Sequence, residues 1–163
     1  MKPAILFIFF ILFTINLPSQ DLNGQLDENR RIIDDLGISL VLPPEFKETN
    51  KSGRFLHQAS GTSLIVYKTD QIAYQIYKDS LNERYFNSQN LILLQKEFIT
   101  EGEMDGYLFE CSTVINEVPF TRLFFVTGDI NQTILVIVNL LTKVYDEIYP
   151  TIYNSFLTLR DGE

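Results

Sequence analysis

The sequence predicts an α+β protein, a three-layer α/β/α sandwich around a mainly antiparallel sheet. Four extended runs follow one another after residue 90: LILLQKEFIT, GYLFECSTVI, FTRLFFVT and TILVIVNLL. The connectors between them are short and rich in turn-forming residues, as in a meander of antiparallel strands. The last run is apolar at odd and even positions, which indicates a strand covered on both faces. Two stretches with helical spacing are available as the covering layers.

The first residues have the layout of a secretory signal peptide, which we place at residues 1–19. Lys2 is the only charge among the first twenty residues, and the apolar centre, Ala4 to Leu17, has 14 residues. A helix needs about 20 residues to cross a bilayer, so an uncleaved membrane anchor is the less favoured alternative. Cleavage is expected after Ser19 or Gln20, with no cysteine nearby for lipid attachment. We therefore expect an exported protein, periplasmic or extracellular, without stable membrane insertion after cleavage.

The strands begin after a polar lead-in at residues 20–35, which we expect to be partly helical and loosely held. GISLVLPPEF predicts a strand that stops at Pro43 and Pro44, because proline cannot donate a ladder hydrogen bond. FLHQAS and SLIVYKT, joined by a turn at Gly61, predict a hairpin. We expect one folded domain at residues 36–160 and a short tail at 161–163.

Two segments have helical spacing. Between Asp70 and Tyr85, apolar residues recur every three or four positions, which predicts one amphipathic helix of about four to five turns. Thr69 or Asp70 can cap its start. TKVYDEIYPTIYNSFLTL predicts a second helix. Pro150 lies inside that stretch, so we expect two short helical pieces or a kink there.

The composition limits the classes of partner. The chain of 163 residues has 13 basic and 21 acidic residues and a net charge of −8. Loss of Lys2 with the signal peptide leaves 12 basic residues and a charge of −9. A surface this acidic repels phosphate backbones, so nucleic acid is not an expected partner. A lone cysteine in an exported protein forms no internal disulfide, so stability must come from packing.

The single cysteine and the single histidine are the first candidates for catalysis. Cys111 shares a strand face with Tyr107 and Phe109, and a buried cysteine behaves as an inert small hydrophobe. His57 lies on another predicted strand, and we expect it to be partly exposed. A Cys111–His57 dyad is the unfavoured alternative, because it needs the two side chains in hydrogen-bond contact. We predict no catalytic residue.

We also predict no cofactor and no metal site. One histidine and one cysteine do not make an ordinary zinc site. DLNGQLDE lacks the spacing of a calcium loop, and Glu101, Glu103 and Asp105 in EGEMDG fit a solvated hairpin tip better. Walker, Rossmann and Gly-x-Ser-x-Gly patterns are absent from the sequence. The sequons at Asn50 and Asn131 matter only in a host that glycosylates exported proteins.

Three tyrosines form the candidate binding site. Tyr145, Tyr149 and Tyr153 make a stripe beside the apolar face of the last predicted helix. Such a stripe is more often core, or the edge of a core, than a ligand platform. If it is exposed, it is the best candidate for binding a partner, because tyrosine offers much contact area at low entropic cost.

Three stretches share a pattern with a known family. LGISLVLPPEF places a glycine and a serine before alternating apolar residues, a proline and an aromatic residue. EGEMDGYLFECSTVI is a glycine-containing turn into a strand, and IYPTIYNSFLTL is a closing helix with a Ser-aromatic tail. Over residues 36–159 this pattern resembles the PsbP/DcrB-like domains.

The resemblance implies an α/β/α sandwich around an antiparallel sheet. It also implies binding to other proteins rather than catalysis. Domains of this kind include an extrinsic photosystem subunit, a nuclear-import factor that binds a small GTPase, and bacterial envelope proteins. No residue of this chain is assigned a role by the resemblance.

These observations predict an exported, non-catalytic accessory protein of the cell envelope that recognises another protein. The alternative is a protein that binds a small apolar or carbohydrate ligand in an aromatic-lined cleft. A Cys/His hydrolase is the third possibility. A contiguous aromatic-lined pocket would favour the small ligand. A flat, exposed apolar patch would favour the protein partner.

Overall fold

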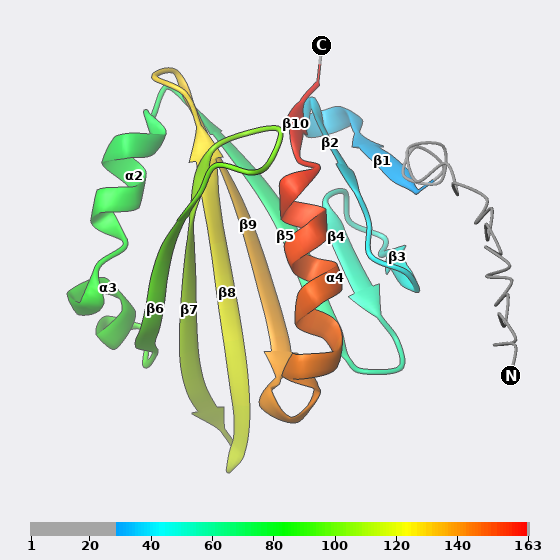
Figure 1. Cartoon of the computed structure of the whole chain (residues 1–163), viewed down its shortest axis with the longest axis vertical. Helices are drawn as coiled ribbons and strands as arrows, with labels where there is room; N and C mark the ends of the chain where they lie inside the picture. Colours follow the sequence, from blue (N-terminus) through cyan, green and yellow to red (C-terminus); the bar gives the residue numbers. More distant parts are fainter. Residues whose placement is uncertain (1–28, 163) are drawn as a thin grey trace, which may run out of the picture.

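Figure 1 shows the computed structural model, in which residues 29–162 are described. The predicted signal peptide, residues 1–19, and the first part of the lead-in, residues 20–28, lie outside the described residues. Residues 29–162 form a large antiparallel sheet, a small sheet and helices, which is the α+β architecture that the sequence predicts. None of the helices within this range is long and apolar enough to cross a membrane.

The small sheet joins the two ends of the described chain. Its strands are β1 (Arg30–Ile33), β2 (Ile38–Val41) and β10 (Arg160–Asp161), with β2 in the middle and both neighbours antiparallel to it. A 3-10 helix, η1 (Asp34–Leu36), links β1 to β2. The prediction of a loosely held lead-in is wrong for its described part, because β1 is paired and Ile33 is buried. The predicted tail also begins inside a strand.

The large sheet has the order β3-β4-β5-β9-β8-β7-β6, and each neighbouring pair is antiparallel. Its strands are β3 (Phe46–Glu48), β4 (Arg54–His57), β5 (Thr62–Asp70), β6 (Ile92–Ile99), β7 (Gly106–Ile115), β8 (Val118–Gly128) and β9 (Gln132–Leu141). The predicted hairpin and the predicted meander of four strands are therefore confirmed. β9, the last strand of the meander, also pairs with β5 on its other side and so joins the two halves of the sheet.

The first predicted helix is two shorter helices, α2 (Tyr74–Ser80) and α3 (Glu83–Ser88). β5 continues to Asp70, so the predicted caps lie in a strand that pairs with β9. Asn82 separates the helices, because its side chain accepts a hydrogen bond from the Tyr85 main-chain N–H and so starts a new helix. The prediction of one continuous helix is wrong, since the spacing of apolar residues does not reveal a cap inside the run.

The last helix, α4 (Tyr145–Leu157), follows a 3-10 turn, η2 (Thr142–Val144). It runs through Pro150, so the expected division into two pieces does not occur. Pro150 is exposed, while the opposite side of the helix buries Ile148, Ile152 and Phe156. Packing of this apolar stripe outweighs the one hydrogen bond that proline removes.

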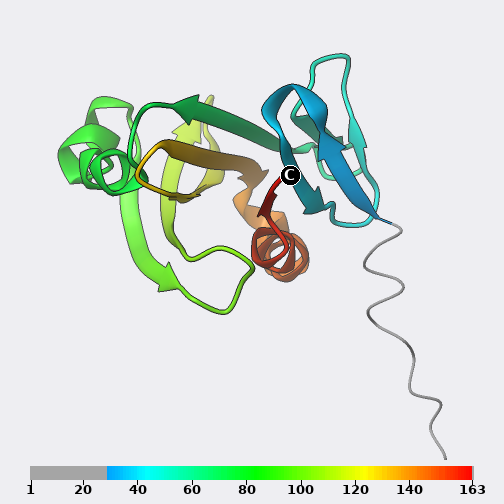
Figure 2. The same cartoon turned by 90° about the horizontal axis from the view of Figure 1, so that it is seen from above.

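Hydrophobic side chains cover both faces of the large sheet, so the fold has three layers. One cluster lies between the sheet, β2 and α4, where Phe125 stacks on Phe156 at 5.1 Å between ring centroids. The other packs the sheet against α2 and α3 and contains Phe86, Phe109 and Cys111. Figure 2 shows α4 end-on, with strands of the large sheet between it and α2 and α3. The predicted α/β/α sandwich is confirmed.

Candidate functional site

The three candidate tyrosines lie together on α4 at the edge of the core. The rings of Tyr145 and Tyr149 stack at 4.8 Å between centroids, and those of Tyr149 and Tyr153 are 5.9 Å apart. All three side chains are half-buried against the cluster beneath α4. The stripe therefore forms as predicted, as a layer between helix and sheet with part of its surface exposed.

Carboxylates of the sheet face this stripe. The Tyr145 hydroxyl donates a hydrogen bond to Glu110 Oε2 at 2.7 Å, and burial together with this hydrogen bond raises the pKa of Tyr145. Burial, then the charges of Glu97 and Glu110, raise the pKa of Tyr149. The Tyr145 hydroxyl is thus hydrogen-bonded to a side chain of β7 in the large sheet. A role for the stripe in partner binding stays a prediction.

Cys111 lies in the middle of β7 and has 0% of its surface exposed. It packs in the cluster beneath α2 and α3. Burial raises the pKa of the thiol to about 12, and the nearby Arg122 guanidinium opposes this effect only in part. The predicted burial of Cys111 is confirmed.

We expect Cys111 to resist alkylation in the folded protein. With a pKa of about 12 the thiol stays protonated at neutral and mildly basic pH, and the reactive species is the thiolate. Iodoacetamide treatment followed by intact-mass spectrometry should show no adduct in native buffer and full labelling in concentrated urea. Equal labelling in both solutions would contradict the burial and restore Cys111 as a candidate nucleophile.

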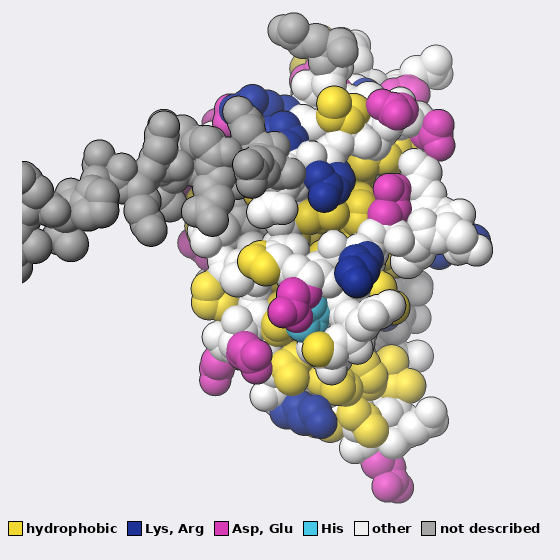
Figure 3. All heavy atoms as spheres, turned by 90° about the vertical axis from the view of Figure 1, so that its right-hand side faces the viewer, with side chains coloured by type: hydrophobic (Ala, Val, Ile, Leu, Met, Phe, Trp, Pro, Cys, Tyr) yellow, Lys and Arg dark blue, Asp and Glu magenta, His cyan; other side chains and the backbone are white. Residues whose placement is uncertain are grey.

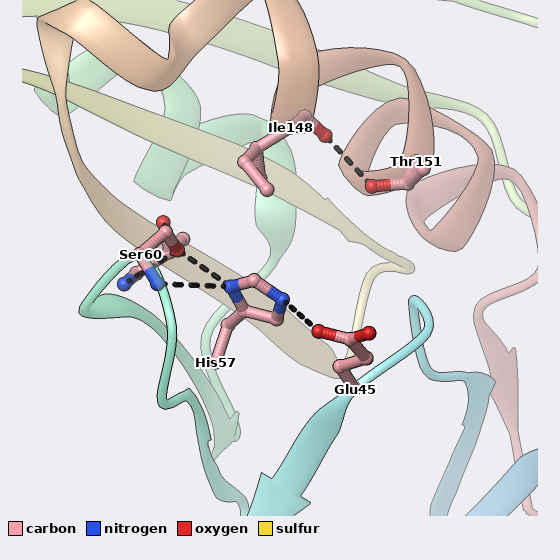
Figure 4. Close-up of polar contacts among 6 residues, drawn as sticks. Glu45, His57, Ser60, Ile148 and Thr151 are labelled. Carbon is pink, nitrogen blue, oxygen red and sulfur yellow. Dashed lines mark hydrogen bonds and ion pairs between the residues drawn. The ribbon is translucent and has the colours of Figure 1, made fainter.

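His57 is the centre of a polar network in the turn between β4 and β5 (Figure 4). Its Nδ1 accepts the Ser60 main-chain N–H at 3.3 Å and lies 2.7 Å from Ser60 Oγ. Its Nε2 donates to Glu45 Oε2 at 3.1 Å. The three side chains follow the order of a serine–histidine–acid triad, with the two ring nitrogens exchanged. His57 is buried, with 9% exposed, rather than partly exposed as predicted.

The Ser60 hydroxyl is hydrogen-bonded within its own turn. Its Oγ donates to Thr62 Oγ1 at 2.7 Å and accepts the Thr62 main-chain N–H at 3.2 Å. Because His57 Nδ1 accepts the Ser60 main-chain N–H, it has no proton to donate, and the Ser60 hydroxyl hydrogen lies between two acceptors, Thr62 Oγ1 and His57 Nδ1. The Gly61 N–H closes the same turn on the His57 carbonyl oxygen at 2.9 Å. The network therefore braces the turn, and the Ser60 hydroxyl takes part in it.

The structure does not bring Cys111 and His57 together. Their strands, β7 and β4, are separated by β5, β9 and β8, a distance of about 19 Å at ~4.8 Å per strand. Cys111 packs with the cluster under α2 and α3, whereas His57 faces the other side of the sheet, as the pairing register shows. The Cys111–His57 dyad is not formed.

The acidic loop joins β6 to β7, and Glu101, Glu103 and Asp105 are exposed there, as predicted for a solvated hairpin tip; Glu103 also anchors the loop. The Glu103 side chain pairs with Arg160, and this hydrogen-bonded cation lowers the pKa of the carboxyl. The Glu103 main-chain N–H also donates to the Leu157 carbonyl oxygen at 2.9 Å. Within residues 29–162, no group of three or more His, Cys, Asp and Glu side chains is placed to hold a metal ion. The DLNGQLDE stretch lies outside that range.

A further surface, which the sequence did not reveal, lies on the large sheet. Helices α2 and α3 cover only part of the face on which they pack, and side chains of β4, β5, β8 and β9 beyond them are exposed or half-exposed. We call this surface the open face. Its apolar residues are Leu56, Ile65, Tyr67, Phe120, Ile137 and Leu141.

One polar row crosses the open face. Arg122, Asn139 and Ser63 stand directly opposite one another on β8, β9 and β5. The Arg122 Nε–H donates to Asn139 Oδ1, and Asn139 Nδ2 donates to Ser63 Oγ at 3.2 Å. Arg122 is therefore held through Nε, and among the described residues its terminal nitrogens make no hydrogen bond or ion pair.

Charge divides between the two faces of the large sheet. On the side of α2 and α3, the charged side chains of its described strands are all basic, namely Lys47, Arg54, Lys96 and Arg122. On the side of α4 they are mostly acidic, namely Glu48, Lys68, Asp70, Glu97 and Glu110. Of these cations, Arg54 and Arg122 lie on the open face and Lys47 lies at its border, so its strands contribute only positive charge in a protein of net charge −8.

Hollows indent the open face and its borders. One of about 510 Å³ lies at the end of the β7–β8 hairpin, beside Phe120 and Leu141. A second, of about 340 Å³, lies where α2 and α3 meet the sheet and is lined by Tyr67 and Tyr85, and a third, of about 310 Å³, lies beside Arg54. In Figure 3, hydrophobic side chains gather at the lower end of the molecule, where Figure 1 places the β7–β8 hairpin.

Comparisons by sequence find no match among models of known protein families and none among curated proteins. Comparison of structures finds proteins of the same fold. LpqN, described as involved in cell envelope biogenesis of Mycobacterium tuberculosis, is 11% identical, with a TM-score of 0.59 over 87% of this chain and 97% of LpqN. Cyanobacterial PsbP (CyanoP) from Synechocystis is 13% identical, with a TM-score of 0.57 over 81% of this chain and 91% of CyanoP.

A third similar structure is a protein from Bacteroides thetaiotaomicron. It is 14% identical, with a TM-score of 0.56 over 83% of this chain, and this chain spans about half of its length, 48%. Sequence identities this low show a similarity of fold alone. The fold of this chain is PsbP-like, as the resemblance in its sequence implies.

Proposed function

We propose that the protein is an exported, non-catalytic accessory protein of the cell envelope, which recognises another protein through the open face. The observation that carries this proposal is an exposed, hollowed apolar surface beside the part of the large sheet that α2 and α3 cover. Contiguous exposed apolar patches can mark interaction sites. Aromatic residues and arginine, both present on the open face, are enriched at protein interfaces. The envelope role described for LpqN, a protein of similar fold, agrees with the proposal.

The candidate nucleophiles favour a non-catalytic role. Cys111 is buried with a raised pKa, and the Ser60 hydroxyl is used by its own turn. A nucleophile needs a neighbouring base and an open approach for the substrate. His57, the one histidine of the chain, braces a turn instead.

The hollow beside α2 and α3 favours a second function, the binding of a small apolar ligand. It has about 340 Å³ and is lined by Tyr67, Tyr77, Tyr85 and Phe124, which is within the size range of ligand sites. Purification from the host followed by native mass spectrometry tests this function. A retained small molecule that is lost in Tyr85→Ala would support it, and a mass equal to that of the polypeptide would count against it.

Site-specific photocrosslinking tests the proposed protein partner. We expect benzoylphenylalanine at Leu56, on the open face, to give one reproducible adduct with a protein in the host's envelope. The same probe at Ile130, which is 78% exposed in the turn between β8 and β9, should give no such adduct. A probe at Tyr149 tests the tyrosine stripe in parallel.

Competition separates specific capture from chance proximity. Excess wild-type protein should suppress the adduct at Leu56, and folded Leu141→Asp protein should not, because a carboxylate would be placed in the hollow of about 510 Å³ beside the β7–β8 hairpin. Equal competition by the two proteins would contradict docking on the open face. An adduct from Tyr149 alone would move the binding surface to α4.

A further inference from the structure

We infer that the partner segment bound by the open face is an amphipathic helix with acidic residues along its apolar side. This inference rests on the proposed function and names the chemistry of its partner. It follows from the charge of the open face, from the dimensions of the uncovered sheet, and from the layers of the fold.

The charge of the open face selects an acidic partner. Lys47 and Arg54 lie on neighbouring strands at one border of the surface, and Arg122 lies across its middle. Among residues 29–162, none of the three forms an ion pair. The described strands contribute no acidic side chain to this side of the sheet. A partner with carboxylates would meet unpaired positive charge at the rim and apolar side chains between.

The dimensions of the uncovered sheet suit one helix. The ten residues of β9 span about 33 Å, whereas the seven residues of α2 span about 10 Å. Across β4, β5, β9 and β8 the sheet is about 14 Å wide, at ~4.8 Å per strand. A helix with its side chains is about 10–12 Å in diameter. The partner helix would complete the layer that α2 and α3 begin.

A protein helix fits this surface better than a membrane does. A bilayer offers a broad, even surface, whereas the open face is indented by hollows of about 510, 340 and 310 Å³ that accept protruding side chains. The net charge of −8 would also repel an anionic bilayer. An acidic helix also meets this repulsion, but its few carboxylates can lie directly opposite Lys47, Arg54 and Arg122, whereas a bilayer spreads its negative charge over a wide surface.

Synthetic peptides of about 18 residues, roughly 27 Å long as helices, test the inference by fluorescence anisotropy with the protein purified from its host. One peptide has a leucine face flanked by glutamates, and a second carries lysines in place of the glutamates. A third has the composition of the first in an order that abolishes the apolar face. We expect the first to bind roughly three- to tenfold more tightly than either of the others at low salt. The preference over the lysine peptide should shrink as salt is added.

A matched pair of variants locates the effect. Lys47→Gln/Arg54→Gln removes two positive charges from the open face and its border, and Thr100→Glu/Asn154→Glu makes the same change in net charge at exposed positions away from it, after β6 and on α4. We expect the first pair to abolish the preference for the glutamate peptide and the second to keep it. Equal loss in both variants, or equal affinity for all three peptides, would overturn the inference.

Two further outcomes separate this inference from the proposed function. A photocrosslink at Leu56 that wild-type protein suppresses, combined with no preference among the peptides, would overturn the acidic helix and leave the protein partner in place. Binding to phosphatidylglycerol vesicles that disappears in Lys47→Gln/Arg54→Gln would overturn both, because it would assign the open face to a lipid surface.

Discussion

Replacement of Phe125 by alanine is expected to lower the free energy of unfolding by about 3–5 kcal/mol. Phe125 is fully buried on β8, in the middle of the large sheet, and stacks on Phe156 of α4 with the rings 14° apart. Its loss opens a cavity between sheet and helix that neither rigid layer can fill. Because domains of this size are stable by only about 5–15 kcal/mol, urea denaturation should show a large decrease in the midpoint.

Phe120 on the same strand provides the matched control. It is half-exposed and points to the open face, so Phe120→Ala should cost no more than about 1 kcal/mol. The same substitution should weaken partner capture, because Phe120 lines the hollow beside the β7–β8 hairpin. Equal losses of stability at the two positions would show that Phe125 does not occupy the core as described.

The local pattern of the sequence was sufficient to predict most strands of the large sheet. Short turns connect β7 to β8 and β8 to β9. Each of these strands therefore pairs with the next one in the sequence, and turn residues and strand patterns are enough to predict such pairing. β1 was not predicted, because RRII has no pattern of its own and becomes a strand only by pairing with β2 and burying Ile33. The division between α2 and α3 depends on one side-chain hydrogen bond of Asn82.

The candidate site was only partly predictable for the same reason. The stripe of Tyr145, Tyr149 and Tyr153 follows from helical spacing, which is local. The exposure of the open face depends on how much of the sheet α2 and α3 cover. Ile65 and Ile137 have the alternation of covered strands, but both are only partly buried: Ile137 packs at the edge of the cluster beneath α2 and α3, and Ile65 lies outside that cluster. Their exposure is a property of the layer above, and nothing in the sequence of β5 or β9 encodes it.

Substitution of Gly106 by alanine is expected to lower the free energy of unfolding by about 1–3 kcal/mol. Gly106 is the first residue of β7, and a Cβ there would lie 2.6 Å from Phe125 Cε2 and 2.8 Å from the Val126 carbonyl oxygen. The carbonyl is fixed, because Val126 belongs to the strand that pairs with β7. Neither neighbour moves freely, so the added methyl group has to distort the pairing of β7 with β8. Urea denaturation measures the loss.

A second substitution tests whether the clash with Phe125 is the cause. Leucine at position 125 removes the ring edge that the new methyl group would meet, so Gly106→Ala/Phe125→Leu should be less destabilised than the sum of the single variants. A coupling of about 0.5–3 kcal/mol is expected for residues in direct contact. Strict additivity would mean that the Val126 carbonyl, rather than the ring, sets the limit at Gly106. In that case the start of β7 would be constrained by strand pairing alone, and the stack of Phe125 on Phe156 would be free to adjust.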